Sequence, residues 1–180
     1  MIGLLPGHGG NDPGAVSPAG WREADLVRDV AAAARVEALL AGGGPDLVVE
    51  DGGGTYRERE RRAAKRGALR AVVQLHADAV EAEVGPDRAT LFYWPGSASG
   101  RRLAHVLADA LEPVLPWPVL VLEALPGRWG RAHGVLRQHA ATAVLVELGF
   151  TDGALGRVRL PELVVPLGEA LARGAAAWTP

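Results

Sequence analysis

Short apolar runs alternate along this chain with longer segments of helical spacing, and this alternation constrains the fold most. The runs, typical of buried strands, cover residues 2–5, 47–49, 71–75, 89–94, 119–122 and 143–146. Helices are expected over residues 23–40, 57–69 and 160–176, and between a Ser97 or Ser99 cap and Pro113. The pattern predicts an α/β fold whose central sheet is largely parallel (mixed), has about six strands and carries helices on both faces.

The length of 180 residues suits one domain with a hydrophobic core and is short for two. The sequence shows no internal repeat and no linker leading to another module, so we expect a single domain over residues 1–180. A monomer is the expected state.

Charge and residue content exclude several classes of function. The formal net charge of -2 gives no basic surface for nucleic acid. No apolar stretch approaches the ~20 residues of a membrane span, so no membrane insertion is expected. The first residues resemble no signal peptide, which favours synthesis in the cytoplasm. The chain has no cysteine, so a metal site would use His, Asp or Glu.

Three candidate metal ligands stand where predicted strands or helices begin or end. His8 follows the first strand, Glu23 begins the first long helix, and His76 follows the buried strand 71–75. In parallel α/β sheets, the carboxyl ends of the strands form the usual ligand crevice. Two histidines and one glutamate suit a catalytic zinc site, which leaves the fourth position to water.

The glycines around His8 could instead indicate a phosphate-binding loop. A dinucleotide loop requires glycine where Asp12 stands, and the Gly-Lys-Ser/Thr of a P-loop is missing. The glycines are better explained by close passage of the backbone past a bound ion or substrate.

Glu147 stands at the end of a strongly apolar run, where a carboxylate is costly to desolvate unless it has a partner. Near a metal it could take a proton from water, with its pKa raised by burial.

Four motifs, in the same order from residue 2 to about residue 152, resemble the zinc-dependent N-acetylmuramoyl-L-alanine amidases of autolysins and phage endolysins. They are Pro6-Gly7-His8-Gly9-Gly10 with Asp12-Pro13-Gly14-Ala15, Glu23, Leu75-His76-Ala77, and Val144-Leu145-Val146-Glu147-Leu148-Gly149-Phe150. The segment Val135-Leu136-Arg137 also resembles that family.

The resemblance implies Zn²⁺ bound by His8, Glu23 and His76, with Glu147 as the catalytic residue. It implies hydrolysis of the amide bond between N-acetylmuramic acid and L-alanine in peptidoglycan. With no separate cell-wall-binding domain and no signal peptide, the expected setting is a phage endolysin, made in the host cytoplasm and acting on the wall after release.

The sequence departs from the family pattern at four positions beside these motifs. Leu5 replaces the usual Asp, Gln74 replaces Ser, Asp78 replaces Asn, and Lys65 replaces the Asn of the preceding helix. Such positions orient ligands, so these changes bear on rate and specificity more than on zinc itself.

Other functions and other residues stay open at this point. The alternative functions are a zinc peptidase acting on wall stem peptides and a non-catalytic peptidoglycan-binding module. The remaining histidines, His105, His133 and His139, are interpreted as solvated or packing residues. Stacking on sugar rings is the alternative for Trp94, Trp117 and Trp129, but burial is commoner for aromatic residues and no role is assigned to them. The basic cluster at residues 57–70 is interpreted as a solvated helix face. Scarce Asn, Gln, Cys and Met indicate either a GC-rich genome or a thermostable protein.

Overall fold

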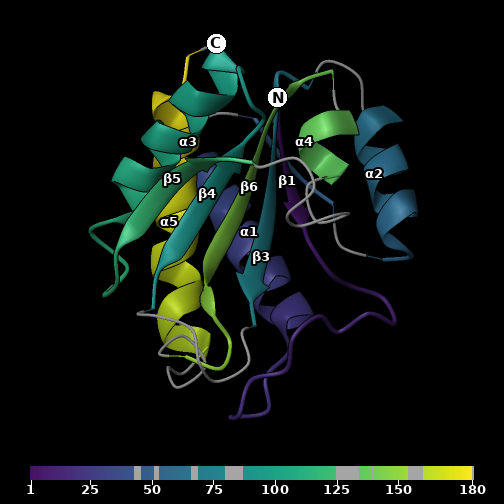
Figure 1. The fold of residues 1–180 in the computed structure, drawn as a ribbon, viewed down its shortest axis with the longest axis vertical. Coiled ribbons are helices and arrows are strands. Elements are labelled where there is room, and N and C mark those ends of the chain that lie inside the picture. The colour runs from purple at the N-terminus through teal and green to yellow at the C-terminus, as the bar shows by residue number, and fades with distance from the viewer. Residues whose placement is uncertain are drawn as a thin grey trace.

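Six strands form one mixed sheet, in the order β2-β1-β3-β6-β4-β5 (Figure 1). The computed structural model describes residues 1–42, 46–50, 53–65, 69–79, 87–124, 134–138, 140–153 and 160–179. The strands are β1 (Ile2–Pro6), β2 (Leu47–Val49), β3 (Ala71–Asp78), β4 (Ala89–Tyr93), β5 (Val119–Glu123) and β6 (Thr142–Phe150). The strands β2, β1, β3 and β6 pair in parallel, whereas β4 pairs antiparallel with β6 and parallel with β5. The predicted α/β class and mixed six-stranded sheet are confirmed.

Helices cover both faces of the sheet (Figure 1). One face carries α1 (Glu23–Leu40), α3 (Ala98–Leu111) and α5 (Leu160–Ala177), which pack on one another as well as on the strands. The other face carries the shorter α2 (Tyr56–Lys65) and α4 (Gly134–Gln138). The order of the strands explains this arrangement. The connection from β1 to β2 moves toward one edge of the sheet, and the connection from β2 to β3 moves back toward the opposite edge. Right-handed crossovers then place α1 and α2 on opposite faces.

The larger core lies under α1, α3 and α5. On α1, the predicted series at helical spacing is Leu26, Val27, Val30, Ala34 and Leu39. The first four are fully buried, as the pattern predicts, but Leu39 in the last turn is 70% exposed. Each buried leucine or valine contributes roughly 1.5–3 kcal/mol by leaving water. Ser97 caps α3, because its hydroxyl accepts a hydrogen bond from the backbone N–H of Gly100. Among the described residues, no helix is long and apolar enough to cross a membrane.

The alternation of side chains along β3 determines which of them project from the face of the sheet that carries α2 and α4. Val73, Leu75 and Ala77 belong to the larger core, and Val72 belongs to a smaller core under α4. Because successive side chains of a strand point to opposite faces, His76 projects on the same side as Val72. The helices on that side are short, so the carboxyl end of β3 is thinly covered there.

Two strands are longer than the apolar runs predict. β3 continues from residue 75 to Asp78, and β6 continues from residue 146 to Phe150, so His76 and Glu147 lie within strands and not just beyond them. The two strands pair with each other across this extension, and that pairing supplies hydrogen bonds that a hydrophobic pattern does not reveal. The helix α4 was not predicted, and the described part of α2 ends at Lys65 instead of residue 69.

Candidate functional site

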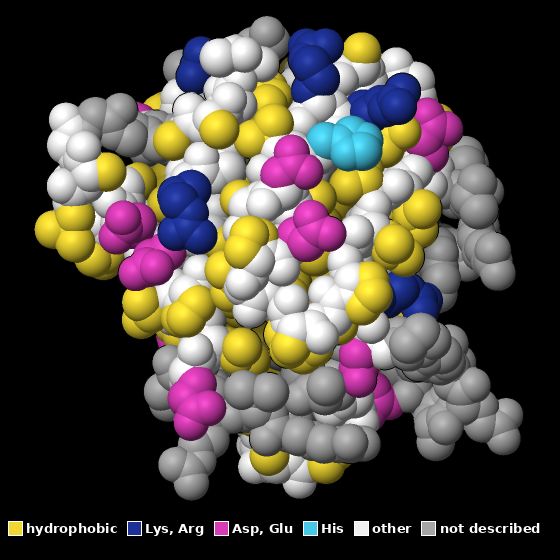
Figure 2. All heavy atoms as spheres, turned by 90° about the vertical axis from the view of Figure 1, so that its left-hand side faces the viewer, with side chains coloured by type: hydrophobic (Ala, Val, Ile, Leu, Met, Phe, Trp, Pro, Cys, Tyr) yellow, Lys and Arg dark blue, Asp and Glu magenta, His cyan; other side chains and the backbone are white. Residues whose placement is uncertain are grey.

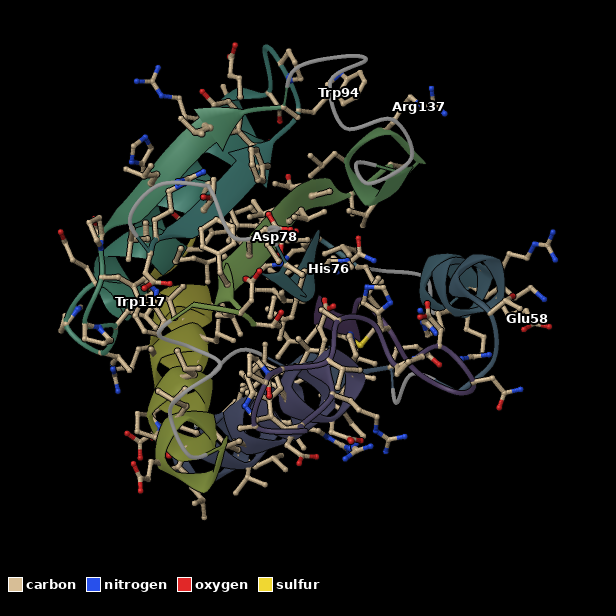
Figure 3. All side chains as sticks on the ribbon, turned by 60° about the horizontal axis from the view of Figure 1, so that its bottom comes forward. Glu58, His76, Asp78, Trp94, Trp117 and Arg137 are labelled. Atoms are coloured by element: carbon tan, nitrogen blue, oxygen red, sulfur yellow. The ribbon has the colours of Figure 1, made fainter. Side chains whose placement is uncertain are left out.

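His8, Glu23 and His76 come together at the carboxyl ends of β1 and β3. One ligand atom from each lies within 4.8 Å of the others. His8 Nε2 lies 3.4 Å from Glu23 Oε2, and His76 Nδ1 lies 3.0 Å from Glu23 Oε1. The two imidazole rings meet edge to face, with their centroids 5.0 Å apart. Figure 3 looks onto this edge of the sheet, with His76 near its centre.

Backbone amides fix the Glu23 carboxylate between the two histidines. The N–H of Ala15 donates to Oε2 at 2.9 Å, and the N–H of Ala77 donates to Oε1 at 3.0 Å. Burial raises the pKa of Glu23, but the hydrogen bond and charge of His76, the charge of His8 and the N–H of Ala15 outweigh it, so the pKa lies below the usual range. This carboxylate is therefore ionised and buried, and it points toward the two histidines. It does so although Glu23 is the first residue of α1, where a carboxylate often only stabilises the helix N-terminus.

Asp12 orients His8 from the side away from Glu23. Asp12 Oδ2 lies 2.9 Å from His8 Nδ1, while Asp12 Oδ1 accepts a hydrogen bond from the N–H of Gly14. A carboxylate on one ring nitrogen leaves the other nitrogen to bind a metal and fixes the orientation of the ring. In the sequence, Asp12 belongs to the motif around His8 but has no predicted role. Its position four residues after His8 is the feature that could have indicated the contact.

Two glycines allow the loop after β1 to approach the side chains of Glu23 and His76. A Cβ on Gly7 would stand 2.1 Å from Cε1 of His76, and a Cβ on Gly14 would stand 2.5 Å from Oε2 of Glu23. Gly14 also has a φ of 64°, which L-residues with a side chain rarely adopt. The prediction that these glycines let the backbone pass close to the site is consistent with this packing.

Arg59 of α2 holds the same loop and contradicts the interpretation of the basic cluster as a wholly solvated face. It is only 2% exposed. Its guanidinium donates to the carbonyls of Gly7 at 2.6 Å, Gly54 at 2.9 Å and Gly9 at 3.3 Å. The carbonyls on either side of His8 are thus tied to α2. No local pattern could reveal this contact, since Gly7 and Gly9 lie about fifty residues before Arg59 in the sequence.

Glu147 lies beside His76 on the same face of the sheet. The two residues are Cα partners in the β3–β6 pairing, and Thr90 is the partner of Glu147 on β4. The Oε2 atom of Glu147 is buried and has no hydrogen-bond partner among the residues that the structure describes. Burial raises the pKa of Glu147 well above its usual range, and the negative charges of Asp78 and Glu23 raise it further.

The four departures from the family pattern lie at three places in the fold. Leu5 and Gln74 are paired neighbours on β1 and β3, both buried, and the amide oxygen of Gln74 has no partner among the described residues. Asp78 lies at the end of β3 near His76 (Figure 3), and its pKa is raised, first by burial and then by the charge of Glu23. Lys65 is exposed at the end of α2.

The other histidines and tryptophans lie apart from these ligands or outside the description. Trp117 is 6% exposed and donates its indole N–H to the carbonyl of Leu148, so it is a core residue. Trp94 is partly exposed, and Figure 3 places it at the periphery of the view. His105 is exposed on α3, as interpreted. His133, His139 and Trp129 lie outside the described residues, as does the loop predicted around residues 85–86.

Comparison with solved structures finds the same fold in bacterial amidases. The amidase AmiC2 of Nostoc punctiforme is 25% identical and superposes with a TM-score of 0.75, over 97% of this chain and 94% of that one. The catalytic domain of CwlV from Bacillus (Paenibacillus) polymyxa var. colistinus is 17% identical, with a TM-score of 0.73 over 97% and 95% of the two chains.

An endolysin catalytic domain targeting Clostridia difficile is 18% identical, with a TM-score of 0.64 over 94% and 95% of the two chains. No curated protein matches the chain. The family described as N-acetylmuramoyl-L-alanine amidase matches residues 2–174, nearly the whole length. The chain therefore belongs to the N-acetylmuramoyl-L-alanine amidase family.

Proposed function

We propose that this protein is a zinc-dependent amidase that hydrolyses the bond between N-acetylmuramic acid and L-alanine in peptidoglycan. His8, Glu23 and His76 would bind the zinc, and Glu147 would act as general base. The observation that carries the proposal is the convergence of two imidazoles and a buried carboxylate beside Glu147, a half-buried carboxylate whose buried Oε2 has no hydrogen-bond partner among the described residues.

The three ligands fit zinc by spacing and by chemistry. Tetrahedral zinc with bonds of about 2.0–2.2 Å places neighbouring ligand atoms roughly 3.3 Å apart. The distances of 3.4 Å and 3.0 Å from the Glu23 oxygens to His8 and His76 agree with that spacing. The carboxylates of Glu23 and Asp78 also give this end of the sheet a negative charge that a divalent cation would neutralise.

Glu147 is suited to move a proton and not to bind the metal. It lies outside the cluster of three ligands, but its register places it next to His76. A carboxyl group with a pKa raised by burial accepts a proton more readily at neutral pH than an exposed one does.

The reaction divides between the ligands and Glu147. When bound, zinc supplies Lewis-acid chemistry, acidifying water and polarising the scissile carbonyl. Glu147 takes the proton from the attacking water and then gives a proton to the departing L-alanine amine. Asp12 and the amides of Ala15 and Ala77 hold His8 and Glu23 in place, so the ligands need not reorganise during hydrolysis.

The decisive experiment measures bound zinc and released muropeptides for two variants that each replace a carboxylate by an amide. Glu147→Gln should keep about one zinc per chain, while hydrolysis falls by about 10²–10⁴-fold, the usual contribution of a positioned general base. Glu23→Gln should lose zinc, because a neutral amide is a poorer ligand. Glu112→Gln changes an exposed carboxylate at the end of α3 and is the control.

Three results would contradict the proposal. If Glu147→Gln loses its zinc or cuts at the wild-type rate, Glu147 is not the base. If chelation leaves hydrolysis intact, the metal is not required. Mass spectrometry of the products separates the alternatives, because a stem-peptide peptidase leaves the sugar–peptide amide intact and a binding module releases nothing.

We also propose that the protein is a phage endolysin that acts on the wall after release from the cytoplasm. The similarity to an endolysin catalytic domain supports this setting without singling it out, because bacterial amidases have the same fold. Expression in a host with and without a phage holin tests it. Lysis that requires the holin supports an endolysin, and export without a holin contradicts it.

A further inference from the structure

A second site lies at the other end of the sheet. A surface pocket of about 620 Å³ is lined by Tyr93 at the end of β4, Glu123 at the end of β5, the first turns of α3 and the C-terminal segment 177–179. Here it is called the α3 pocket. Because β4 runs antiparallel to β6, the end of β4 lies at the edge opposite to the carboxyl ends of β1, β3 and β6. Figure 1 likewise shows the C-terminus beside one end of α3.

The α3 pocket brings two arginines together. Arg101 and Arg102 of α3 line it beside His105, and Glu123 is the one acidic residue among the described residues of its lining. Arg101 and Arg102 are adjacent in sequence and both are exposed. Neither forms an ion pair with any residue that the structure describes. Figure 2 faces the side of the molecule with β5 and α3, and its upper part shows Lys or Arg side chains around a histidine, with acidic side chains next to it.

Trp178 supplies a buried indole to the wall of the pocket. Trp178 lines the pocket and is 3% exposed, and its indole N–H has no hydrogen-bond partner among the described residues. The indole nitrogen can only donate, so it can be satisfied only by an acceptor. The contrast with Trp117 is informative, because that equally buried indole donates to a backbone carbonyl.

The N-terminus of α3 adds to the positive electrostatic potential that Arg101 and Arg102 create at the pocket. This helix has 14 residues and begins at the pocket, so its positive end lies beside Arg101 and Arg102. Two guanidinium groups match the paired oxygens of a carboxylate or phosphate. Tyr93, Val106 and Trp178 give the pocket non-polar walls, and its volume is that of a small-molecule site.

We propose that the α3 pocket binds a small organic anion, through a carboxylate or phosphate group held by Arg101 and Arg102 beside the wall that Trp178 forms. This site is separate from the proposed catalytic centre and does not depend on zinc. Hydrolysis of an N-acetylmuramoyl amide frees a carboxylate on the sugar, so the proposed reaction would itself produce such an anion.

The test follows the indole N–H resonance of Trp178 by NMR in the full chain, assigned with Trp178→Phe. The protein is titrated with N-acetylmuramic acid, inorganic phosphate and the neutral sugar N-acetylglucosamine. An anion should shift the resonance saturably. The double variant R101Q/R102Q should raise the Kd of the anion at least about tenfold, because it loses the hydrogen bonds from two charged guanidinium groups. The matched control is Arg173→Gln, which removes an exposed arginine from α5.

The outcomes separate the sources of the anion and include the failure of the proposal. Tighter binding of N-acetylmuramic acid than of phosphate identifies a sugar acid as the ligand, and equal or tighter binding of phosphate identifies a free phosphate. Absence of a saturable shift with both anions overturns the site. So does an unchanged Kd in the folded double variant, or equal binding of N-acetylglucosamine. Hydrolysis of peptidoglycan by the double variant should stay at the wild-type level, so the result is distinct from failure of the catalytic proposal.

Discussion

Gly14 offers a test of the proposed metal site that does not replace a proposed ligand. In Gly14→Ala the new Cβ would stand 2.5 Å from Oε2 of Glu23 and 2.7 Å from Cγ of His8. The Glu23 carboxylate cannot move aside freely, because the amides of Ala15 and Ala77 hold both of its oxygens. The substitution should therefore displace ligands while leaving their chemistry unchanged.

The chain supplies a control with nearly the same φ. Gly42 has a φ of 63°, against 64° for Gly14, and a Cβ added to it would meet no atom of the other described residues within 4 Å. Placing an L-residue in this left-handed region costs about 1–2 kcal/mol at either position. For a domain of this size, that cost lowers the Tm by about 2–8 °C. Only the crowding at Glu23 and His8 distinguishes the two variants.

The expected result is a loss of metal affinity in one variant alone. Gly14→Ala should bind zinc about 10–100-fold more weakly, the range for changes that disturb the surroundings of metal ligands, and muropeptide release should fall with it. Gly42→Ala should keep wild-type zinc affinity despite a similar loss of Tm. The assays are competition against a chromophoric chelator and thermal unfolding. Equal zinc affinity in the two variants would refute the reasoning.

Four further predictions concern the surroundings of the site and the stability of the fold. Asp12→Ala should weaken zinc about 10–100-fold in the same chelator competition, because His8 loses the group that orients it; unchanged affinity would remove Asp12 from the site. Arg59→Lys should lower the free energy of unfolding, measured in urea, by about 1–3 kcal/mol, since an ammonium cannot replace a guanidinium that bridges separate carbonyls. The control is Arg61→Lys, which changes an exposed arginine and should alter the free energy of unfolding little. In metal-free protein, Glu147→Gln should be more stable than wild type at pH values above the raised pKa of Glu147, where the folded state must ionise a buried carboxyl. That advantage should vanish as the pH falls below about 4.3, the unfolded-state pKa, because the carboxyl is then protonated in both states; an advantage independent of pH would contradict burial as the cause. If scarce Asn, Gln, Cys and Met reflect a hot habitat, the Tm should exceed the ~45–65 °C of mesophilic domains, and a Tm inside that range leaves codon bias as the explanation.

The sequence by itself determined the class of fold and the residues that can carry the chemistry. Periodicity located the buried face of α1 and the centres of the buried strands, because burial of apolar side chains is a local property that spacing records. The strand β5 was located by its apolar run as well, although Leu120 and Leu122 are exposed. His8, Glu23 and His76 stood out because each lies where an element begins or ends, and Glu147 because a carboxylate is costly in an apolar run.

Only the tertiary structure decided how these residues meet. Pairing between β3 and β6 extends both strands and places Glu147 directly beside His76, which the runs at residues 71–75 and 143–146 could not reveal. Arg59 belongs to a strongly basic segment that predicts a solvated face, yet it is buried against carbonyls of the His8 loop. The α3 pocket likewise joins a helix start, a strand end and the last residues of the chain. In each case the partners are far apart in sequence, and hydrogen-bond geometry between them is fixed only when the packed layers bring them together.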